Sequence, residues 1–352
     1  HEAGTVDVGL LNPNHWPVLD WLVINYFHEK LFITDGAYRP VPWLVDTWEY
    51  TTPTTFVMKL KPGITFHDGT PLDAEAVKFV IDWIMDPASG TWSRGWLEPL
   101  EKVEVVDELT VKWTHKQPWS AFLGIIANVP GYMLSPQQLQ KPGNLYQREP
   151  VGTGPWVLDA REPGSWIRVR RNPNWWYAKY SGHPDMPYFD GIQKQVIPDP
   201  ATRMAALRAG RIHVLGVPLS EVPTVQADRK LNVYFFPANH VVGMRFNHSR
   251  PPFNGLRVRK AVSLAIDRQA FIAGTQFGYG RLASSMYPDD HWAHNPNLLP
   301  VPYDPQQAKQ LLADAGYRNG LTIKGFVTST PEALTAVEAV QGMLSKVGIT
   351  WE

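Results

Sequence analysis

Two histidines and two aspartates lie within six residues, in the segment Asp289 to His294. On a helix, His291 and His294 would share one face and could bind a divalent metal beside the carboxylates. Pro288 and Pro296 flank the segment, however, and proline interrupts regular helices. We therefore predict a solvated loop here. A metal-dependent hydrolase that uses His291 and His294 is the alternative function from another class.

Other reactive motifs of common enzymes are absent from the sequence or incomplete. Gly152-Thr153-Gly154-Pro155 lacks the lysine of a phosphate-binding loop and the third glycine of a dinucleotide-binding loop. We interpret it as a structural turn or hinge. There is no Gly-X-Ser-X-Gly motif and no cysteine, which excludes thiolate metal sites and cysteine nucleophiles. We therefore predict a protein that is not an enzyme and holds no metal or other cofactor.

Turn residues and helix caps indicate the elements that position these segments. Alternating apolar residues predict strands at 5–11, 55–61, 167–171 and 192–197, with two short strands within 103–113. Capping residues predict helices at 73–85, 199–210, 304–316 and 330–348, with others at 18–32 and from 254 onward. Because strands and helices alternate, we predict an α/β fold with mixed sheets in more than one lobe.

Composition limits the class of protein. The 352 residues include 33 basic and 33 acidic side chains, so the formal net charge is zero. A neutral chain has no global field that would attract nucleic acid or an anionic membrane. A single core rarely grows beyond about 300 residues, so at least two lobes are expected. The 15 tryptophans favour a binding cleft, because indole rings offer flat apolar surfaces to ligands.

Both ends of the sequence give expectations of their own. The first residues are polar and run at once into a strand-like pattern, so either the protein is cytosolic or a targeting segment has been removed. The last four residues, 349–352, resemble a strand that stops in mid-course. We expect the chain to be truncated there.

A series of segments resembles the extracellular solute-binding proteins of ABC importers, in family 5, the peptide- and nickel-binding class. One of them is Leu60 to Val77, which reads LKPGITFHDGTPLDAEAV. Each segment by itself is a turn or a helix cap, but together they follow the family's order along nearly the whole chain. The matching segments are 60–77, 150–156, 171–176, 196–203, 246–268 and 303–317.

The resemblance implies a fold and a domain arrangement. The fold would be that of the class II periplasmic binding proteins of cluster C, in which two lobes with mixed sheets close on a ligand and an extra domain is attached. Residues 1–34 and 159–242 would form lobe I, 35–158 the extra domain, and 243–352 an incomplete lobe II. The protein would be a periplasmic or extracellular monomer that delivers its ligand to ABC permease subunits and binds no nucleic acid. The sequence leaves lipid anchoring open.

The resemblance also implies a set of ligand contacts. The loop from Asn14 to Val18 is similar in place to one that touches peptide backbone, and the loop from Thr91 to Trp96 resembles a cleft-facing loop of the extra domain. Tyr132 lies near an arginine position of the nickel binders, and residues 247 and 248 align with polar cleft residues of oligopeptide binders. The implied contacts are Trp16, Trp92, Trp96, Tyr132, Asn247 and His248.

Departures from the family pattern narrow the expected ligand. Ser93 and Tyr132 stand where nickel-chelate binders place arginines, which argues against a carboxylate-rich chelate because arginine supplies bidentate carboxylate contacts. No arginine lies near 328–330, where dipeptide binders place one. An oligopeptide captured by hinge closure is therefore the first expectation. The alternative is an oligosaccharide stacked on Trp16, Trp92 and Trp96.

Overall fold

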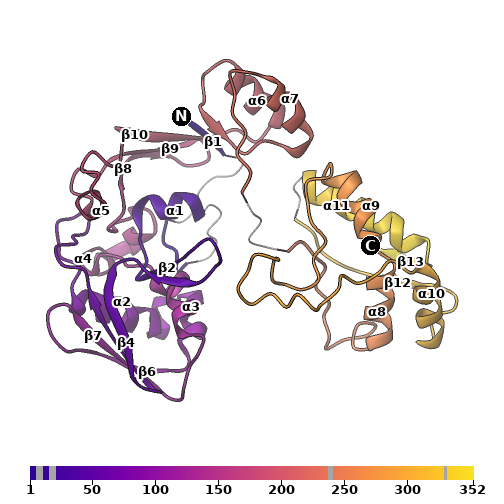
Figure 1. Cartoon of the computed structure of the whole chain (residues 1–352), viewed down its shortest axis with the longest axis horizontal. Coiled ribbons are helices and arrows are strands. Elements are labelled where there is room, and N and C mark those ends of the chain that lie inside the picture. The colour runs from indigo at the N-terminus through magenta and orange to yellow at the C-terminus, as the bar shows by residue number, and fades with distance from the viewer. Residues whose placement is uncertain (5–10, 16–20, 237–240, 329–330) are drawn as a thin grey trace. The chain divides into compact units, whose positions relative to one another are not determined.

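The structure is a computed structural model that describes residues 1–4, 11–15, 21–236, 241–328 and 331–352 (Figure 1). The chain forms two compact units. Unit 1 spans His1–Gly216 and unit 2 spans Val217–Glu352. Each unit has an apolar core of its own.

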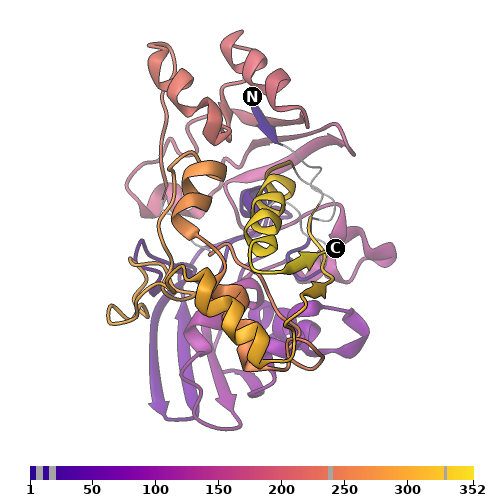
Figure 2. The same cartoon turned by 90° about the vertical axis from the view of Figure 1, so that its right-hand side faces the viewer.

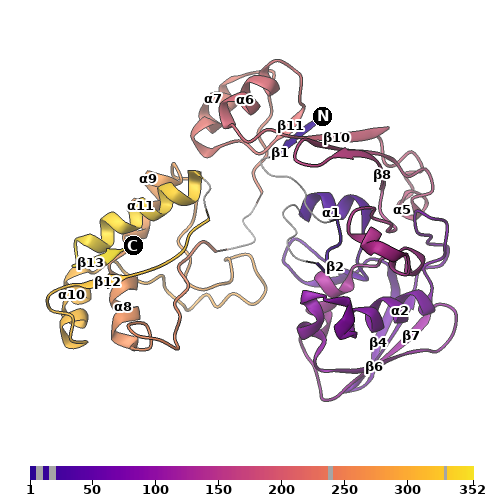
Figure 3. The same ribbon diagram turned by 180° about the vertical axis from the view of Figure 1, so that it is seen from behind.

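Unit 1 contains a five-stranded mixed sheet with the order β11-β1-β10-β9-β8, seen from behind in Figure 3. Strand β1 pairs in parallel with β10 and β11, whereas β10, β9 and β8 are antiparallel neighbours. Helix α1 (Trp21–Phe27) packs on this sheet, where its Val23 and Phe27 share a core with Ile167 and Val169. The strands are β1 (Glu2–Gly4), β8 (Trp156–Glu162), β9 (Trp166–Arg171), β10 (Gly191–Val196) and β11 (Val214–Leu215).

A second sheet of unit 1 is antiparallel and has the order β4-β5-β7-β6. Helix α2 (Ala74–Met85) packs against it (Figure 1), and the largest cluster of buried residues fills the space between them. Phe56, Trp113 and Phe122 are fully buried in that cluster. The strands are β4 (Val45–Thr52), β5 (Thr55–Leu60), β6 (Leu100–Val105) and β7 (Thr110–His115).

The remaining elements of unit 1 are short helices and strands. Most begin at a proline or an Asx residue that accepts from a backbone N–H, as the cap preference predicts. They are β2 (Phe32–Thr34), β3 (Pro40–Pro42), η1 (Pro87–Ser89), η2 (Trp92–Leu97), α3 (Phe122–Ile126), η3 (Val129–Gly131), α4 (Pro136–Leu139), η4 (Pro142–Gln147), α5 (Trp176–Tyr180) and α6 (Pro200–Arg208).

Unit 2 packs helices around a pair of parallel strands, β12 and β13 (Figure 2). Its core joins Val262 of α8, Leu312 of α10 and Leu344 of α11, all nearly or fully buried. The elements are η5 (Leu219–Glu221), α7 (Val222–Ala227), α8 (Leu256–Leu264), α9 (Arg268–Thr275), α10 (Pro305–Asp314), β12 (Leu321–Ile323), α11 (Pro331–Ser345) and β13 (Ile349–Trp351).

The predicted helix at 18–32 was too long. Within the described residues α1 ends at Phe27, and the chain then runs alongside residues 131–133. Leu31 N donates to Gly131 O, Met133 N donates to Glu29 O, and Lys30 forms a β-bridge with Tyr132. This strand-like pairing uses the backbone groups that a longer helix would need.

The other predicted elements correspond closely to the structure. The caps at Asp73, Asp199 and Asp304 are confirmed, because each carboxylate accepts a hydrogen bond from a backbone N–H three residues on. Most of the predicted strand at 5–11 lies outside the described residues. The boundaries of lobe I, the extra domain and lobe II, at 34/35, 158/159 and 242/243, stay predictions. Within the described part of the chain, no helix is both long enough and apolar enough to span a bilayer.

Candidate functional site

Two of the predicted ligand-facing loops meet in unit 1, although 79 residues separate them in sequence. Trp92 N donates to Asn14 O at 3.2 Å, and Trp92 Nε1 donates to Pro13 O at the same distance. Ser93 Oγ donates to Asn14 Oδ1 at 2.5 Å, and both side chains are fully buried. Ser93, at the arginine position of the nickel binders, therefore anchors the other loop.

The indole rings of η2 lie at the surface of this junction. Trp92 and Trp96 are both half-buried, and their rings meet edge to face at 5.1 Å between centroids, with an angle of 86°. Because the two planes are perpendicular, the pair offers one ring face beside one ring edge. Trp16, the third tryptophan of the prediction, lies outside the described residues.

The loop at 12–15 carries hydrogen-bonding atoms that lack partners among the described residues. They are Nδ2 of Asn12, Nδ2 of Asn14 and Nδ1 of His15, each shielded from solvent. Asn12 and Asn14 are both 0% exposed. Burial lowers the pKa of His15, whose Nε2 lies 2.9 Å from Ser89 O. Buried polar groups are normally paired, so this loop has spare capacity to bind a polar group or a water molecule.

Tyr132 is covered rather than open. Only 3% of it is exposed, and its hydroxyl donates to Asn25 Oδ1 at 2.6 Å. Trp21 stacks on its ring at 6.4 Å and 13°, and the Lys30 ammonium lies 5.1 Å from the ring centroid. Burial raises the pKa of Tyr132, so the phenol stays protonated. Tyr132 thus supports Trp21 and Lys30.

Helices η2 and η3 are neighbours, which brings the Trp92–Trp96 pair near the segment that leads into Tyr132. Sequence reasoning placed Trp92, Trp96 and Tyr132 in one site but missed Trp21, Asn25 and Lys30. The helical stripe at 18–32 pointed to core residues only. The position of Lys30 depends on the bridge to Tyr132, for which the sequence carries no local signal.

The buried carboxylate of Glu29 is a hydrogen-bond acceptor for several side chains of unit 1. Glu29 Oε1 accepts from the indole Nε1 atoms of Trp43 and Trp175 at 3.0 and 3.1 Å. Its Oε2 accepts from Trp176 Nε1 and Thr153 Oγ1, both at 2.8 Å. Burial raises the pKa of Glu29, and the four donors act in the opposite direction by stabilising the anion. The network ties together four segments that are far apart in sequence.

The glycines at 152 and 154 permit this close packing. A Cβ on Gly152 would lie 2.1 Å from Phe27 O, and one on Gly154 would lie 2.7 Å from Tyr26 O. Gly154 N donates to Phe27 O at 2.9 Å, and Gly154 O lies 2.9 Å from His67 Nε2. These contacts agree with the interpretation of the segment as a structural turn, and they leave no phosphate cradle.

Asn247 and His248 belong to unit 2 and are both exposed. Asn247 Oδ1 accepts from Ser249 N at 3.0 Å and so closes a local turn. The remaining predicted contacts that the structure describes, Trp92, Trp96 and Tyr132, all belong to unit 1. The part of these residues in ligand binding stays a prediction.

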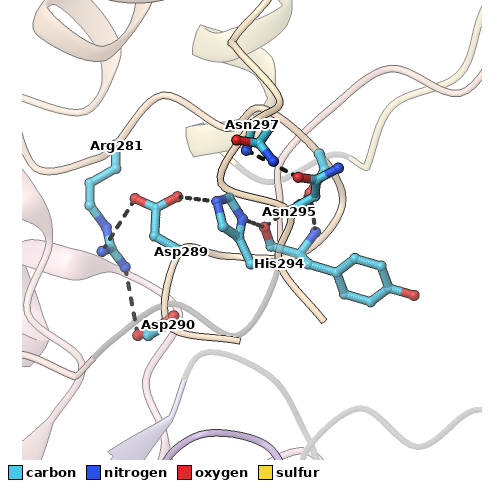
Figure 4. Close-up of polar contacts among 8 residues, drawn as sticks. Arg281, Asp289, Asp290, His294, Asn295 and Asn297 are labelled. Atoms are coloured by element: carbon cyan, nitrogen blue, oxygen red, sulfur yellow. Dashed lines mark hydrogen bonds and ion pairs between the residues drawn. The ribbon is translucent and has the colours of Figure 1, made fainter. Parts of the chain in front are cut away.

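The segment around His291 and His294 is a loop, as predicted. Figure 4 shows that Arg281 faces both Asp289 and Asp290, at 3.7 Å from each carboxylate, and that His294 Nε2 lies 3.9 Å from Asp289. A guanidinium thus occupies the position beside the carboxylates that a cation would take. Within the described ranges, no cluster of three or more histidine or carboxylate side chains is arranged to hold a metal.

A shallow surface hollow of about 510 Å³ lies between α2 and α4. It is lined by Asp73, Phe79 and Gln137 among others and includes none of the predicted contacts. Because this hollow contains none of the predicted contacts, we give the loop junction at Asn14 and Trp92 more weight as the site.

Comparison with known proteins identifies the family of the chain. A sequence profile of the bacterial extracellular solute-binding proteins, family 5, matches residues 39–352. The glutathione-binding protein GsiB of Escherichia coli O1:K1 is 30% identical over 334 residues, which are 94% of this chain and 64% of that protein. The chain therefore spans somewhat less than two thirds of that relative's length.

Solved structures show the same fold. The periplasmic binding protein AgaA of A. tumefaciens R10, in complex with agropinic acid, matches all of this chain and 71% of its own, with a TM-score of 0.86 and 24% identity. The protein DppA of Helicobacter pylori, in complex with the peptide STSA, matches with a TM-score of 0.84 and 23% identity over 72% of its chain. The fold is that of the periplasmic binding proteins, and the chain belongs to family 5 of the bacterial extracellular solute-binding proteins.

Proposed function

We propose that the protein is the solute-binding component of an ABC importer and that its ligand is an oligopeptide. The observation that carries the proposal is the junction of the 12–15 loop with η2. There, buried hydrogen-bonding atoms that lack partners among the described residues lie on the same loop that anchors a half-buried pair of indoles. Peptide ligands need hydrogen bonds for their backbone and tolerant apolar surfaces for their side chains.

In this proposal Trp92 and Trp96 contact ligand side chains, while Asn14 and His15 satisfy backbone groups of the peptide. Asn247 and His248 are proposed as further polar contacts of the ligand. Binding shifts the protein toward a closed state that the permease recognises, so the ligand is captured and released unchanged. The protein acts outside the cytoplasmic membrane, as a monomer and without catalysis.

An oligosaccharide is the second candidate. The half-buried Trp92 and Trp96 rings favour it, since sugars stack on indole faces. The perpendicular arrangement weakens it, because only one ring face is presented beside one edge. Trp92 is also held in place by its bond to Pro13 O, which fixes the orientation of its ring.

Isothermal titration with tri-alanine, penta-alanine, glutathione and cellotetraose would separate these ligands. We expect a peptide to bind and cellotetraose not to bind. Trp96→Ala should weaken peptide binding about ten-fold, as loss of a central aromatic contact does. Trp166→Ala is the matched control, because that half-buried indole lies on β9 against Arg168.

If cellotetraose bound tightest and no peptide bound, the ligand would be an oligosaccharide and the oligopeptide proposal would be wrong. A protein that binds none of the four, both as isolated and after mild unfolding and refolding to release any co-purified solute, would contradict the oligopeptide proposal. Equal loss of affinity in the Trp96 and Trp166 variants would remove η2 from the site.

A further inference from the structure

Lys30 is a half-buried lysine whose ammonium has no oxygen partner among the residues that the structure describes. Its Nζ atom lies over the aromatic ring of Tyr132, 5.1 Å from the ring centroid. Burial lowers the pKa of Lys30, which reflects the cost of holding the charge there. An aromatic face compensates only part of that cost.

The other sheltered lysines of unit 1 do have oxygen partners. Lys61 Nζ donates to Trp43 O and Val45 O, both at 2.6 Å, and Lys194 Nζ lies 2.9 Å from a carboxylate oxygen of Glu2. The half-buried Lys78 and Lys112 are each paired with a carboxylate. Among the described lysines of this unit that are not fully exposed, Lys30 is therefore the exception.

The acidic and polar groups nearest to Lys30 are already engaged. Glu29 precedes it in the chain, but its carboxylate accepts from three indoles and Thr153. Asn25 Oδ1 accepts the hydroxyl of Tyr132. Within the described part of the chain, the positive charge of Lys30 is thus not neutralised.

The surroundings of that charge form a shelf that solvent can reach. Trp21, which stacks on Tyr132, is 37% exposed, and Asn25 is exposed as well. The shelf is therefore made of Trp21 and Lys30, which both lie against the buried ring of Tyr132. An unpaired cation near a partly exposed indole fits an anion attached to an organic group.

We propose that Lys30 is a specificity-determining residue that pairs with a carboxylate of the ligand on the shelf that it forms with Trp21. This inference rests on the proposed function and deepens it, because it selects peptides that carry a free carboxylate over peptides that lack one. The carboxylate can be the C-terminus of a peptide or an acidic side chain. Both would form a charge-assisted hydrogen bond with the ammonium, which is stronger than a neutral one.

A spectroscopic experiment tests the site directly. The lysines of the intact protein are reductively methylated with ¹³C-formaldehyde, which keeps their charge, and the Lys30 resonance is assigned from Lys30→Arg. Sodium acetate, tri-alanine, tri-alanine amide and glutathione are then titrated against a sodium chloride control. We expect the Lys30 resonance to shift and saturate with the carboxylates but not with the amide or with chloride.

A binding experiment measures the effect on affinity. Lys30→Met should weaken binding of tri-alanine or glutathione ten- to a hundred-fold and leave tri-alanine amide within about two-fold. Lys30→Arg should retain most of the affinity. Lys59→Met is the matched control, since it removes the same charge from an exposed position on β5.

Tri-alanine amide separates the two carboxylate sources. If the C-terminal carboxylate is the anion, tri-alanine amide does not gain the binding free energy that Lys30 contributes. If an acidic side chain is the anion, a glutamate-containing peptide amide keeps it. Either result supports the proposal.

The two proposals fail in different ways. Peptide binding that is equal in wild type, Lys30→Met and Lys59→Met overturns the role of Lys30 and leaves the proposed function intact. A Lys30 resonance that no carboxylate shifts also overturns the role of Lys30 alone. A resonance that saturates with acetate, in a protein that binds no peptide, retains the anion site and rejects the peptide.

Discussion

Glu29 shows how one residue can hold distant segments together. Its two oxygens accept four hydrogen bonds, from Trp43, Trp175, Trp176 and Thr153, and the side chain is almost fully buried. A carboxylate is the only common side chain that accepts at both oxygens and donates at neither. These donors offset only part of the cost of burying the charge, because burial still raises the pKa of Glu29.

Replacing Glu29 by glutamine should destabilise unit 1 by about 3 kcal/mol, because the new NH₂ group would face two donors and leave them unpaired. The free energy of unfolding is measured by urea titration with tryptophan fluorescence. Glu49→Gln, at an exposed position on β4, is the control. A loss below about 1 kcal/mol would show that the four donors contribute little to stability.

His28 predicts a pH dependence. It is 1% exposed, and burial, with the nearby His67, lowers its pKa from 6.5 to about 4. Between these values the unfolded chain binds a proton that the folded chain does not. The stability contributed by neutral His28 is therefore complete above about pH 6.5 and is lost as the pH falls toward 4, by up to about 3 kcal/mol.

Urea titrations of unit 1 at pH 7.5, 6, 5 and 4.5 measure this slope. In His28→Gln, the free energy of unfolding should change less with pH between 6.5 and 4. His183→Gln, at an exposed position, should have the same pH dependence as wild type. An identical pH slope in wild type and His28→Gln would contradict the prediction.

At the scale of elements, the Gly152-Thr153-Gly154 turn depends on backbone contact. A Cβ at Gly152 would meet Phe27 O at 2.1 Å, so Gly152→Ala must displace the segment that leads from α1 to Lys30. We expect a loss of about 3 kcal/mol or more. Gly124→Ala in α3 is the control, because nothing lies within 4 Å of its Cβ position and its φ is not positive.

The start of α2 offers a milder test. Asp73 Oδ1 accepts from Ala76 N at 2.8 Å. Removing this cap in Asp73→Ala should cost about 1 kcal/mol in the unfolding free energy of unit 1. Asp73→Asn should recover most of it, since an amide oxygen also caps. Equal losses in the two variants would point to charge instead of capping.

At the scale of the whole molecule, the chain divides at Gly216 into units with separate cores. We expect residues 1–216 to fold alone, with the near-ultraviolet circular dichroism and cooperative unfolding of a packed protein. In the intact chain, Gly152→Ala should lower the melting temperature of unit 1 only. A fragment without cooperative unfolding, or a single transition that shifts as one, would show that the units depend on each other.

The sequence by itself determined the local structure and the family. Asp73, Asp199 and Asp304 begin helices where the cap residues predict, because an N-cap needs only neighbours in the chain. In the same way, alternating apolar residues predict the strand at 55–60, and the flanking prolines predict the loop at His291. The order of the turns and caps was enough to identify family 5.

Tertiary structure decided where those elements meet. Three features depend on pairing with residues about 100 or more positions away in the sequence. They are the end of α1 at Phe27, the hydrogen bonds of Glu29 to Thr153 and Trp175, and the unpaired ammonium of Lys30 beside Tyr132. Local sequence carries no such information, since hydrogen bonds across the fold form only when distant segments pack. For the same reason, the sequence carried no signal that Tyr132 lies buried with Trp21 and Lys30 against its ring. Its part in ligand binding stays a prediction.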